Sequence, residues 1–176
     1  MKTLIKHLCI WFAITIVITA LVGCGQSTEP TAEGDIAGHL AQGRQYFDQG
    51  DFTEAIREFQ SVVRLDPKSV EGHFRLGNAH FQQGNLTDAA EEFQKTLELD
   101  QSNVDACSNL GAVYYQQGQF AKAETEFGRA LSLAPNDAEI RYNIGATHIQ
   151  QAKLDSGIAE FREALRLDPN LARAYF

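Results

Sequence analysis

The sequence is poor in cysteine and proline and has fewer bases than acids. Its 176 residues include 3 Cys, 4 Pro, 1 Trp and 1 Met. Hydrophobic residues make up 44% of the chain, which excludes a disordered or collagen-like protein. The 15 Lys and Arg against 23 Asp and Glu give a formal net charge of −8. Nucleic-acid binding depends on Lys and Arg neutralising phosphates, so this acidic chain is predicted to have no nucleic-acid partner.

The sequence also lacks the short motifs that mark common catalytic and metal-binding sites. It contains no Gly-x-Ser-x-Gly, no glycine-rich phosphate loop with a lysine, and no His-Glu-x-x-His. We predict that the chain is not an enzyme and has no catalytic residue, no cofactor and no metal site. One alternative stays open, namely that the chain is the N-terminal part of a longer enzyme whose catalytic domain follows Phe176.

The N-terminal segment differs in composition from the rest of the chain. Lys2 and Lys6 precede an uncharged apolar run at residues 8–22, which is the organisation of a secretory signal peptide. The run is shorter than the roughly 20 apolar residues of a membrane-spanning helix. We therefore predict that residues 1–23 are a signal peptide that is removed. An uncleaved membrane anchor is the alternative.

The segment Leu21-Val22-Gly23-Cys24 follows the apolar run directly and resembles the lipobox of bacterial lipoproteins. The resemblance implies that Cys24 carries lipid and becomes the mature N-terminus, with about 0.8 kcal/mol of membrane attachment per buried CH₂. The alternative is that Cys24 is an ordinary thiol. Gly25, in place of an aspartate, implies by the same resemblance a location in the cell envelope, at the outer membrane and facing the periplasm. The mostly polar residues 24–35 predict a flexible tether between lipid and fold.

Glycine and phenylalanine recur through the rest of the chain at one spacing. Gly43, Gly77, Gly111 and Gly145 are each 34 residues apart, and sixteen residues after each of them stands Phe59, Phe93, Phe127 or Phe161. A fixed period of this length indicates stacked helical hairpins. The period divides the chain into four repeats, at residues 36–69, 70–103, 104–137 and 138–171.

Each repeat carries the signals of two helices and a turn. In the second repeat, small and apolar residues keep helical spacing from Phe74 to Phe81. Gly84 then supplies the left-handed residue that ends this helix, and a second helix is predicted at about residues 86–99. Asp-Pro or Ala-Pro ends the second helix in the other three repeats, because proline cannot continue a helix. The predicted fold class is all-α.

These features resemble the tetratricopeptide repeat (TPR) family, most closely in the run from Leu110-Gly111-Ala112-Val113-Tyr114 through Ala130 to Pro135. The resemblance extends over residues 36–171 and implies a right-handed superhelical solenoid of stacked helix-turn-helix hairpins that binds proteins. In the last repeat Ala152 replaces the turn glycine and Gly157 replaces the packing alanine. The last repeat is therefore expected to be the least stable.

The C-terminal residues 172–176 resemble the opening of a fifth repeat, and we predict that they start a further, truncated helix. These five residues are too few to cover Ile158, Phe161 and Leu165 of the last repeat. An exposed apolar end of this kind predicts self-association through the C-terminal repeat.

The family resemblance places a partner-binding groove on the first helix of each repeat. The residues that it implies for this groove are Arg44, Phe47, Phe74, Asn78, Phe81, Asn109, Ala112, Tyr115, Tyr142, Asn143, Ala146 and Ile149. Some family members hold a peptide's C-terminal carboxylate with Lys, Arg and Asn, but Phe74 stands where such a clamp has a lysine, so we reject that mode. We expect an extended or helical peptide held by aromatic and amide contacts. A groove wall without a partner is the alternative.

Two further sets of residues repeat at the 34-residue spacing. His39, His73 and Cys107 share one place, but equivalent places in stacked hairpins lie roughly 10 Å apart, too far for one metal ion. We expect these three to be partly buried packing residues. Glu71, Asp105 and Glu139 lie in first turns, where the helix dipole stabilises negative charge. The alternative is an acidic stripe for a basic partner.

The sequence thus predicts a membrane-anchored protein–protein interaction scaffold of the bacterial cell envelope. The expected partner is a peptide or protein segment held in the groove, and the expected membrane contact is the lipid on Cys24. By resemblance, lipoproteins of this build include assembly factors of pili and secretins and adaptors of cell-wall enzymes. A self-assembling structural lipoprotein is the alternative from another class.

Overall fold

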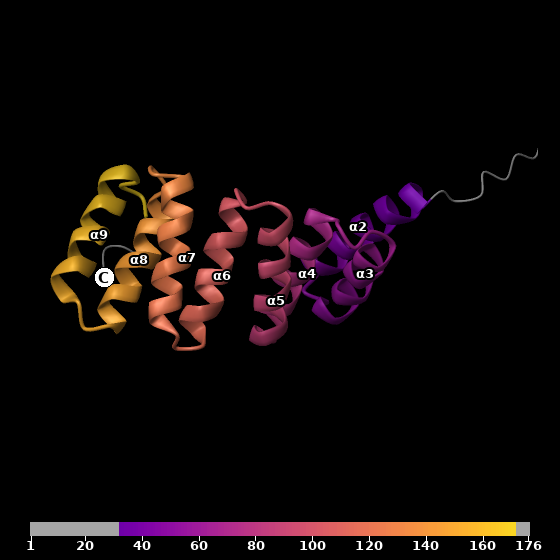
Figure 1. The fold of residues 1–176 in the computed structure, drawn as a ribbon, viewed down its shortest axis with the longest axis horizontal. Helices are drawn as coiled ribbons and strands as arrows, with labels where there is room; N and C mark the ends of the chain where they lie inside the picture. Colours follow the sequence, from indigo (N-terminus) through magenta and orange to yellow (C-terminus); the bar gives the residue numbers. More distant parts are fainter. Residues whose placement is uncertain (1–31, 172–176) are drawn as a thin grey trace, which may run out of the picture. The chain divides into compact units, whose positions relative to one another are not determined.

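The computed structural model describes residues 32–171, with side chains from Gly34 onward. This part of the chain forms eight α-helices and no strand (Figure 1), which confirms the predicted all-α class. The helices are α2 (Ala32–Asp48), α3 (Phe52–Leu65), α4 (Val70–Gln83), α5 (Leu86–Leu99), α6 (Val104–Gln116), α7 (Phe120–Leu133), α8 (Ala138–Gln150) and α9 (Leu154–Leu167). Among these helices, none is both long and apolar enough to cross a membrane.

The first of these helices begins earlier than the repeat frame predicts. Helix α2 starts at Ala32 and has 17 residues, whereas α4 has 14. Residues 32–35, which the sequence predicts as the end of the tether, are therefore the first turn of a helix. Asp35 suits this place, because an acidic side chain is stabilising near a helix N-terminus. The predicted signal peptide, lipidated Cys24, the rest of the tether and residues 172–176 lie outside the described residues.

Consecutive helices pair into four hairpins that follow the 34-residue frame, namely α2–α3, α4–α5, α6–α7 and α8–α9 (Figure 1). The second helix of one hairpin packs against the first helix of the next, α3 on α4, α5 on α6 and α7 on α8. The first helices of neighbouring hairpins also contact each other, α4 with α6 and α6 with α8. The first helices therefore share one side of the stack, and the predicted solenoid of hairpins is confirmed.

The turn inside each hairpin requires a residue with positive φ. Gly50, Gly84 and Gly118 supply it at φ values of 81°, 85° and 72°. The last hairpin has Ala152 at this place with φ 60°, and no other non-glycine residue of the described part has a positive φ. A side chain in this conformation costs roughly 1–2 kcal/mol. The strained turn thus lies in the repeat that the sequence predicts to be the least stable.

Three of the first helices begin with a side chain that caps the backbone. Ser69 Oγ, Asn103 Oδ1 and Asp137 Oδ1 accept hydrogen bonds from the N–H groups of Gly72, Ala106 and Ile140 at 3.1, 2.9 and 3.0 Å. Such a cap typically contributes about 1 kcal/mol. At the corresponding place after α9 stands Leu171, which is buried with Ala164 in a small apolar cluster. The capping pattern therefore ends with the fourth hairpin.

The recurring glycines and phenylalanines meet inside each hairpin. A methyl group built on Gly43, Gly77 or Gly111 would lie 2.5, 2.8 or 2.8 Å from the ring of Phe59, Phe93 or Phe127. These rings are almost completely buried, so the two helices of a hairpin cross closely over them. Phe161 packs on Gly145 in the same way but is only half-buried, since the described residues contain no helix after α9.

Candidate functional site

The predicted groove residues lie on the first helices of all four hairpins. They are Arg44 and Phe47 on α2, Phe74, Asn78 and Phe81 on α4, Asn109 and Tyr115 on α6, and Tyr142, Asn143 and Ile149 on α8. Arg44 is exposed and the other nine are half-buried. We call the side of the stack that carries them the first-helix face.

Between α6 and α8 the first-helix face is hollowed by a pocket of about 270 Å³. The pocket is lined by Tyr115 and Tyr142 together with the small residues Ala112 and Ala146. The first two hairpins carry an arginine and an asparagine at the place of these two alanines, so this part of the wall is short and apolar only in the last two hairpins. We call this hollow the tyrosine pocket.

A second pocket of about 400 Å³ continues from the tyrosine pocket toward α9. It shares Tyr115, Tyr142 and Ala146 with the first and adds Ile149 and apolar side chains of α9. The two tyrosine rings are held by phenylalanines of the second helices, with ring centroids 5.5 Å apart for Tyr115 and Phe120. The ring centroids of Tyr142 and Phe161, which lies on α9 of the same hairpin, are 5.3 Å apart. The two pockets therefore form one continuous apolar surface, which exists before a partner binds.

At the other end, between α2 and α4, the first-helix face has a polar pocket of about 210 Å³. Arg44, Arg75 and Asn78 line it, with the rings of Phe47 and Phe59. Arg75 is not among the groove residues predicted from the sequence, although it shares its place in the repeat with Asn109 and Asn143, which are. We call this hollow the arginine pocket.

The middle of the first-helix face is joined by an amide hydrogen bond. Asn109 Nδ2 on α6 donates to Asn78 Oδ1 on α4 at 2.8 Å. Phe74 and Phe81 of α4 pack against the central core, and the Phe74 ring centroid lies 6.0 Å from that of Phe93. These two phenylalanines are thus partly engaged in the fold, which the sequence pattern does not reveal.

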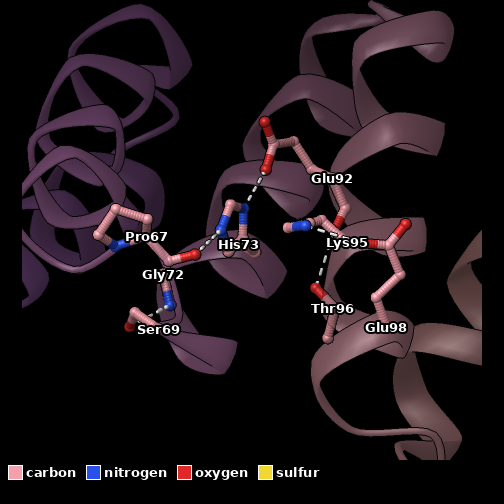
Figure 2. A network of polar contacts seen from close by, with 8 residues as sticks. All are labelled: Pro67, Ser69, Gly72, His73, Glu92, Lys95, Thr96 and Glu98. Atoms are coloured by element: carbon pink, nitrogen blue, oxygen red, sulfur yellow. Dashed lines mark hydrogen bonds and ion pairs between the residues drawn. The ribbon is translucent and has the colours of Figure 1, made fainter.

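Two of the three residues that were considered as metal ligands, His39 and His73, form polar pairs with a glutamate of their own hairpin. His39 Nδ1 lies 2.6 Å from Glu58 Oε2, and His73 Nδ1 lies 2.6 Å from Glu92 Oε2. Figure 2 shows that His73 also reaches back with Nε2 to the Pro67 carbonyl oxygen, at 3.2 Å. Across residues 32–171, no three His, Cys, Asp or Glu side chains are grouped as a metal site requires.

A similar pair recurs in the fourth hairpin with an arginine in place of the histidine. Arg141 Nη1 donates to Glu160 Oε2 at 3.1 Å, and its Nη2 donates to the Pro135 carbonyl oxygen at 3.2 Å. In all three pairs the His or Arg precedes the glutamate by 19 residues. This spacing inside the 34-residue period is the sequence signal that could have identified the pairs. They tie the first helix of a hairpin to its second.

The third hairpin breaks this pattern. Cys107, which is 0% exposed, stands at the place of the His or Arg, and Glu126 stands 19 residues later. Glu126 Oε2 is buried without a hydrogen-bond partner. Burial raises the pKa of Glu126, with a smaller opposing effect of Arg129. Arg129 instead donates to the Gln101 carbonyl oxygen at 2.7 Å, at the place where His73 contacts Pro67 in the second hairpin and Arg141 contacts Pro135 in the fourth.

A carboxylate of α7 joins the last two hairpins. Glu124 accepts a hydrogen bond from Lys153 Nζ at 3.0 Å and lies 3.1 Å from His148 Nε2. The hydrogen bond from Lys153 is the largest cause that lowers the pKa of Glu124 to about 2, and Gln151 and His148 add to it. Lys153 directly follows Ala152, the turn residue with positive φ. The contact between Lys153 and Glu124 therefore holds the turn of the fourth hairpin against the third hairpin.

Comparison with known proteins gives one consistent result. Models of the tetratricopeptide repeat match residues 40–104, 104–137 and 138–171. No curated protein matches the sequence significantly.

Several solved structures have a similar fold. A crystal structure of MamA protein is 26% identical, with a TM-score of 0.75 over 80% of this chain and 77% of that one. MamA from Desulfovibrio magneticus RS-1 is 23% identical, with a TM-score of 0.76 over 80% of each chain. PilF of Pseudomonas aeruginosa is 23% identical, with a TM-score of 0.73 over 81% of this chain and 65% of that one. At 23% identity the last two likenesses concern the fold alone.

Proposed function

The chain belongs to the tetratricopeptide repeat family, and we propose that it is a lipid-anchored adaptor of the bacterial cell envelope that holds a protein segment on its first-helix face. Its fold is that of a protein–protein interaction scaffold. It acts by bringing a partner to the membrane rather than by catalysis. The supporting observation for partner binding is the tyrosine pocket with its apolar continuation toward α9.

Tyr115 and Tyr142 suit the role of binding anchors for a physical reason. Each presents a large rigid ring with few rotatable bonds and a hydroxyl that can hydrogen-bond, so burying it costs little side-chain entropy. Both rings are half-buried and already fixed by phenylalanines of the second helices. A bulky apolar side chain of the partner would displace water from a pocket that is formed before binding.

The envelope location rests on the sequence of the N-terminal segment. The lipobox-like Leu21-Val22-Gly23-Cys24 supports export and lipidation, and Gly25 supports the outer membrane. The assembly of a pilus or a secretin is one process that such an adaptor would serve. Changing Cys24→Ser should leave an unprocessed precursor of higher mass that takes up no acyl label. A normal mature mass in this variant would show ordinary cleavage without lipid.

Pocket-filling variants provide the test of the first-helix face. Ala112→Arg and Ala146→Asn introduce side chains that the first two hairpins carry at the same place of the repeat, so the fold should accept them. The matched control is Ala159→Arg on the exposed surface of α9, where the first hairpin carries Arg57. We expect the pocket variants to abolish partner capture and the control to retain it.

Capture is measured by crosslinking in living cells, followed by mass-spectrometric identification of the crosslinked proteins. Circular dichroism must show equal helix content for the wild type and all variants. One envelope protein captured by the wild type and the control, and lost with the pocket variants, supports the proposal. Equal capture by the pocket variants would contradict a binding site on the first-helix face.

Self-association is a second candidate function, and one observation favours it. Leu154 and Ile158 are 59% and 45% exposed and lie one helical turn apart on α9, so together they form an exposed apolar patch. Ile158→Glu introduces the residue that the third hairpin carries at the same place, so the fold should tolerate it. We expect sedimentation velocity to show a concentration-dependent oligomer for the wild type and a monomer for this variant. A wild type that stays monomeric at high concentration would exclude this candidate.

A further inference from the structure

One side of α9 is apolar and lacks the cover that the same side of the other second helices has. Ile158 is 45% exposed, whereas Ile56, at the same place on α3, is 8% exposed and packs in a cluster with side chains of α4. Phe161 is half-buried, whereas the other three phenylalanines of its column are at most 1% exposed. Helix α9 therefore presents the surface on which α3, α5 and α7 each receive another helix.

The apolar residues of this surface form a stripe along α9. Its members are spaced four, three and four residues apart, and they are the exposed Leu154 and Ile158 and the half-buried Phe161 and Leu165. This alternating spacing is the heptad spacing of a seam between two helices. The spacing is the same in both chain directions, so a second α9 running antiparallel would place Leu154 opposite Leu165 and Ile158 opposite Phe161. We call these four residues the α9 seam.

The charges of α9 favour the same antiparallel arrangement. Three of its charged side chains form ion pairs within the chain, namely Glu160, Glu163 and Arg166. The others, Asp155 and Arg162, are exposed and form no ion pair with a described residue. They are seven residues apart, so both lie on the same side of the helix, next to the seam. In an antiparallel pair these flanking places face each other, so Asp155 of each copy would meet Arg162 of the other.

The other end of the stack does not offer a complementary surface. Helix α4 packs on α3 with the apolar side chains of Leu76 and Ala79. In α2, the first helix of the stack, their places are taken by Gln42 and Gln45, which are both exposed. Packing these amides on the α9 seam would remove them from water without partners. A two-fold contact between two seams avoids this cost and closes at two copies, whereas head-to-tail stacking would continue into a filament.

We propose that two copies of this chain associate by antiparallel pairing of their α9 helices, with the two seams packed together and two Asp155–Arg162 ion pairs beside them. This inference rests on self-association, the second candidate function, and adds its geometry and stoichiometry. Each copy contributes one helix of 14 residues, which is a small interface, so we expect a reversible dimer with a micromolar dissociation constant. Ile158 and Phe161 also line the continuation of the tyrosine pocket, so the dimer would bring two partner-binding surfaces close together.

Site-directed crosslinking of the full chain in living cells tests the antiparallel register. Two copies with different tags are co-expressed, one carrying Leu154→Cys and the other Leu165→Cys, and a short bismaleimide is added. We expect a crosslinked pair, because these two places would face each other. The control carries Leu154→Cys in both copies. At about 1.5 Å per residue these two places would lie roughly 16 Å apart along the helix axis, so the control should give no crosslink.

Exchanging charges tests the two ion pairs and leaves the seam intact, with association measured by sedimentation velocity of the full chain. Asp155→Arg or Arg162→Glu alone would place like charges opposite each other twice, so each should weaken association about tenfold. The chain with both changes should associate as the wild type does, and a mixture of the two single variants should form a mixed dimer. The matched controls Glu91→Arg on α5 and Arg64→Glu on α3 change exposed charges away from α9 and should leave association unchanged.

The outcomes separate this inference from self-association itself. If the wild type stays monomeric at high concentration, both the second candidate function and this inference are wrong. If Ile158→Glu prevents association but the charge exchange gives neither loss nor rescue, α9 mediates self-association and the antiparallel pairing is wrong. A crosslink between two copies with Leu154→Cys, or crosslinks only to a different protein, would also overturn the pairing. Partner capture on the first-helix face is decided independently by Ala112→Arg, which lies outside the seam.

Discussion

Glu126, the unpaired glutamate of the third hairpin, leads to a prediction for which the His73–Glu92 pair of the second hairpin is the reference. Cys107→His would place an imidazole 19 residues before Glu126, as His73 is placed before Glu92 in the second hairpin. The new side chain should approach the Glu126 oxygen that is buried without a partner. We expect the substitution to stabilise the protein although it introduces a polar group into a fully buried place.

Two opposing contributions set the size of this effect. A buried polar group without a partner costs about 1–3 kcal/mol, and the imidazole N–H would remove much of that cost. Histidine is larger than cysteine, and overpacking typically costs about 1–3 kcal/mol when the surroundings cannot yield. The second hairpin holds His73 at the same place with 9% exposure, so the backbone geometry accepts this side chain. Glu126 is only half-buried and partly screened by solvent, so we expect a net gain of about 1 kcal/mol near pH 6.5.

The sign of the pH dependence follows from the raised pKa of Glu126, whose main cause is burial. The folded wild type binds this proton more tightly than the unfolded chain does. The contribution of Glu126 to stability is therefore complete below its unfolded pKa and is lost as the pH rises through its folded pKa. An imidazolium beside Glu126 favours the ionised form and removes this loss. The gain from Cys107→His should thus be larger at pH 6.5 than at pH 4.5.

Urea unfolding of the full chain, followed by circular dichroism at both pH values, measures the effect. The reciprocal change His73→Cys should cost about 2 kcal/mol, because Glu92 and the Pro67 carbonyl both lose their partner. Glu126→Gln should stabilise the wild type at pH 6.5 by removing the buried charge. A Cys107→His variant that is no more stable than the wild type at pH 6.5, or a destabilising Glu126→Gln, would refute the reasoning.

Three further changes are expected to alter stability, each checked by the midpoint of thermal or urea unfolding. Ala152→Gly should stabilise by about 0.5–1 kcal/mol, because φ 60° is strained for alanine; an unchanged midpoint would argue against strain. Gly77→Ala should cost about 1–3 kcal/mol of stability, because its methyl group would lie 2.8 Å from the buried Phe93 ring. The control Gly128→Ala, whose methyl group meets nothing within 4 Å, should be neutral or stabilising. Lys153→Met should raise the pKa of Glu124 from about 2, as measured by NMR titration. It should also cost up to about 1 kcal/mol of stability at neutral pH, and this loss of stability should disappear as the pH falls toward 2.

The repeat frame could be predicted because its signals are local. A glycine that closes a turn, a proline that ends a helix and a small residue at a crossing each act within a few residues of chain. In the structure, Gly84 closes a turn and Gly77 lies at a helix crossing, as their positions in the sequence predict. The early start of α2 was missed for the same reason, because Ala32 and its neighbours lie before the first repeat and carry no periodic signal.

The candidate site could be predicted only in part. The residues predicted for the groove lie on the first helices, and their role in binding stays a prediction. Their division into an arginine pocket and a tyrosine pocket was not visible in the sequence. The tyrosine pocket depends on two hairpins at once, since Ala112 and Tyr115 of α6 line it together with Tyr142 and Ala146 of α8. Arg75 was not predicted, although its place in the repeat is that of the predicted Asn109 and Asn143 and could have identified it.

The sequence by itself determined that residues 36–171 form a stack of four helical hairpins, because the 34-residue period repeats turn, crossing and packing residues whose effects are local. The tertiary structure alone decided which side chains meet across helices. It paired His73 with Glu92 and left Glu126 unpaired beside Cys107. Such contacts depend on the angle and distance at which two helices pack, and these are set jointly by all the side chains between them.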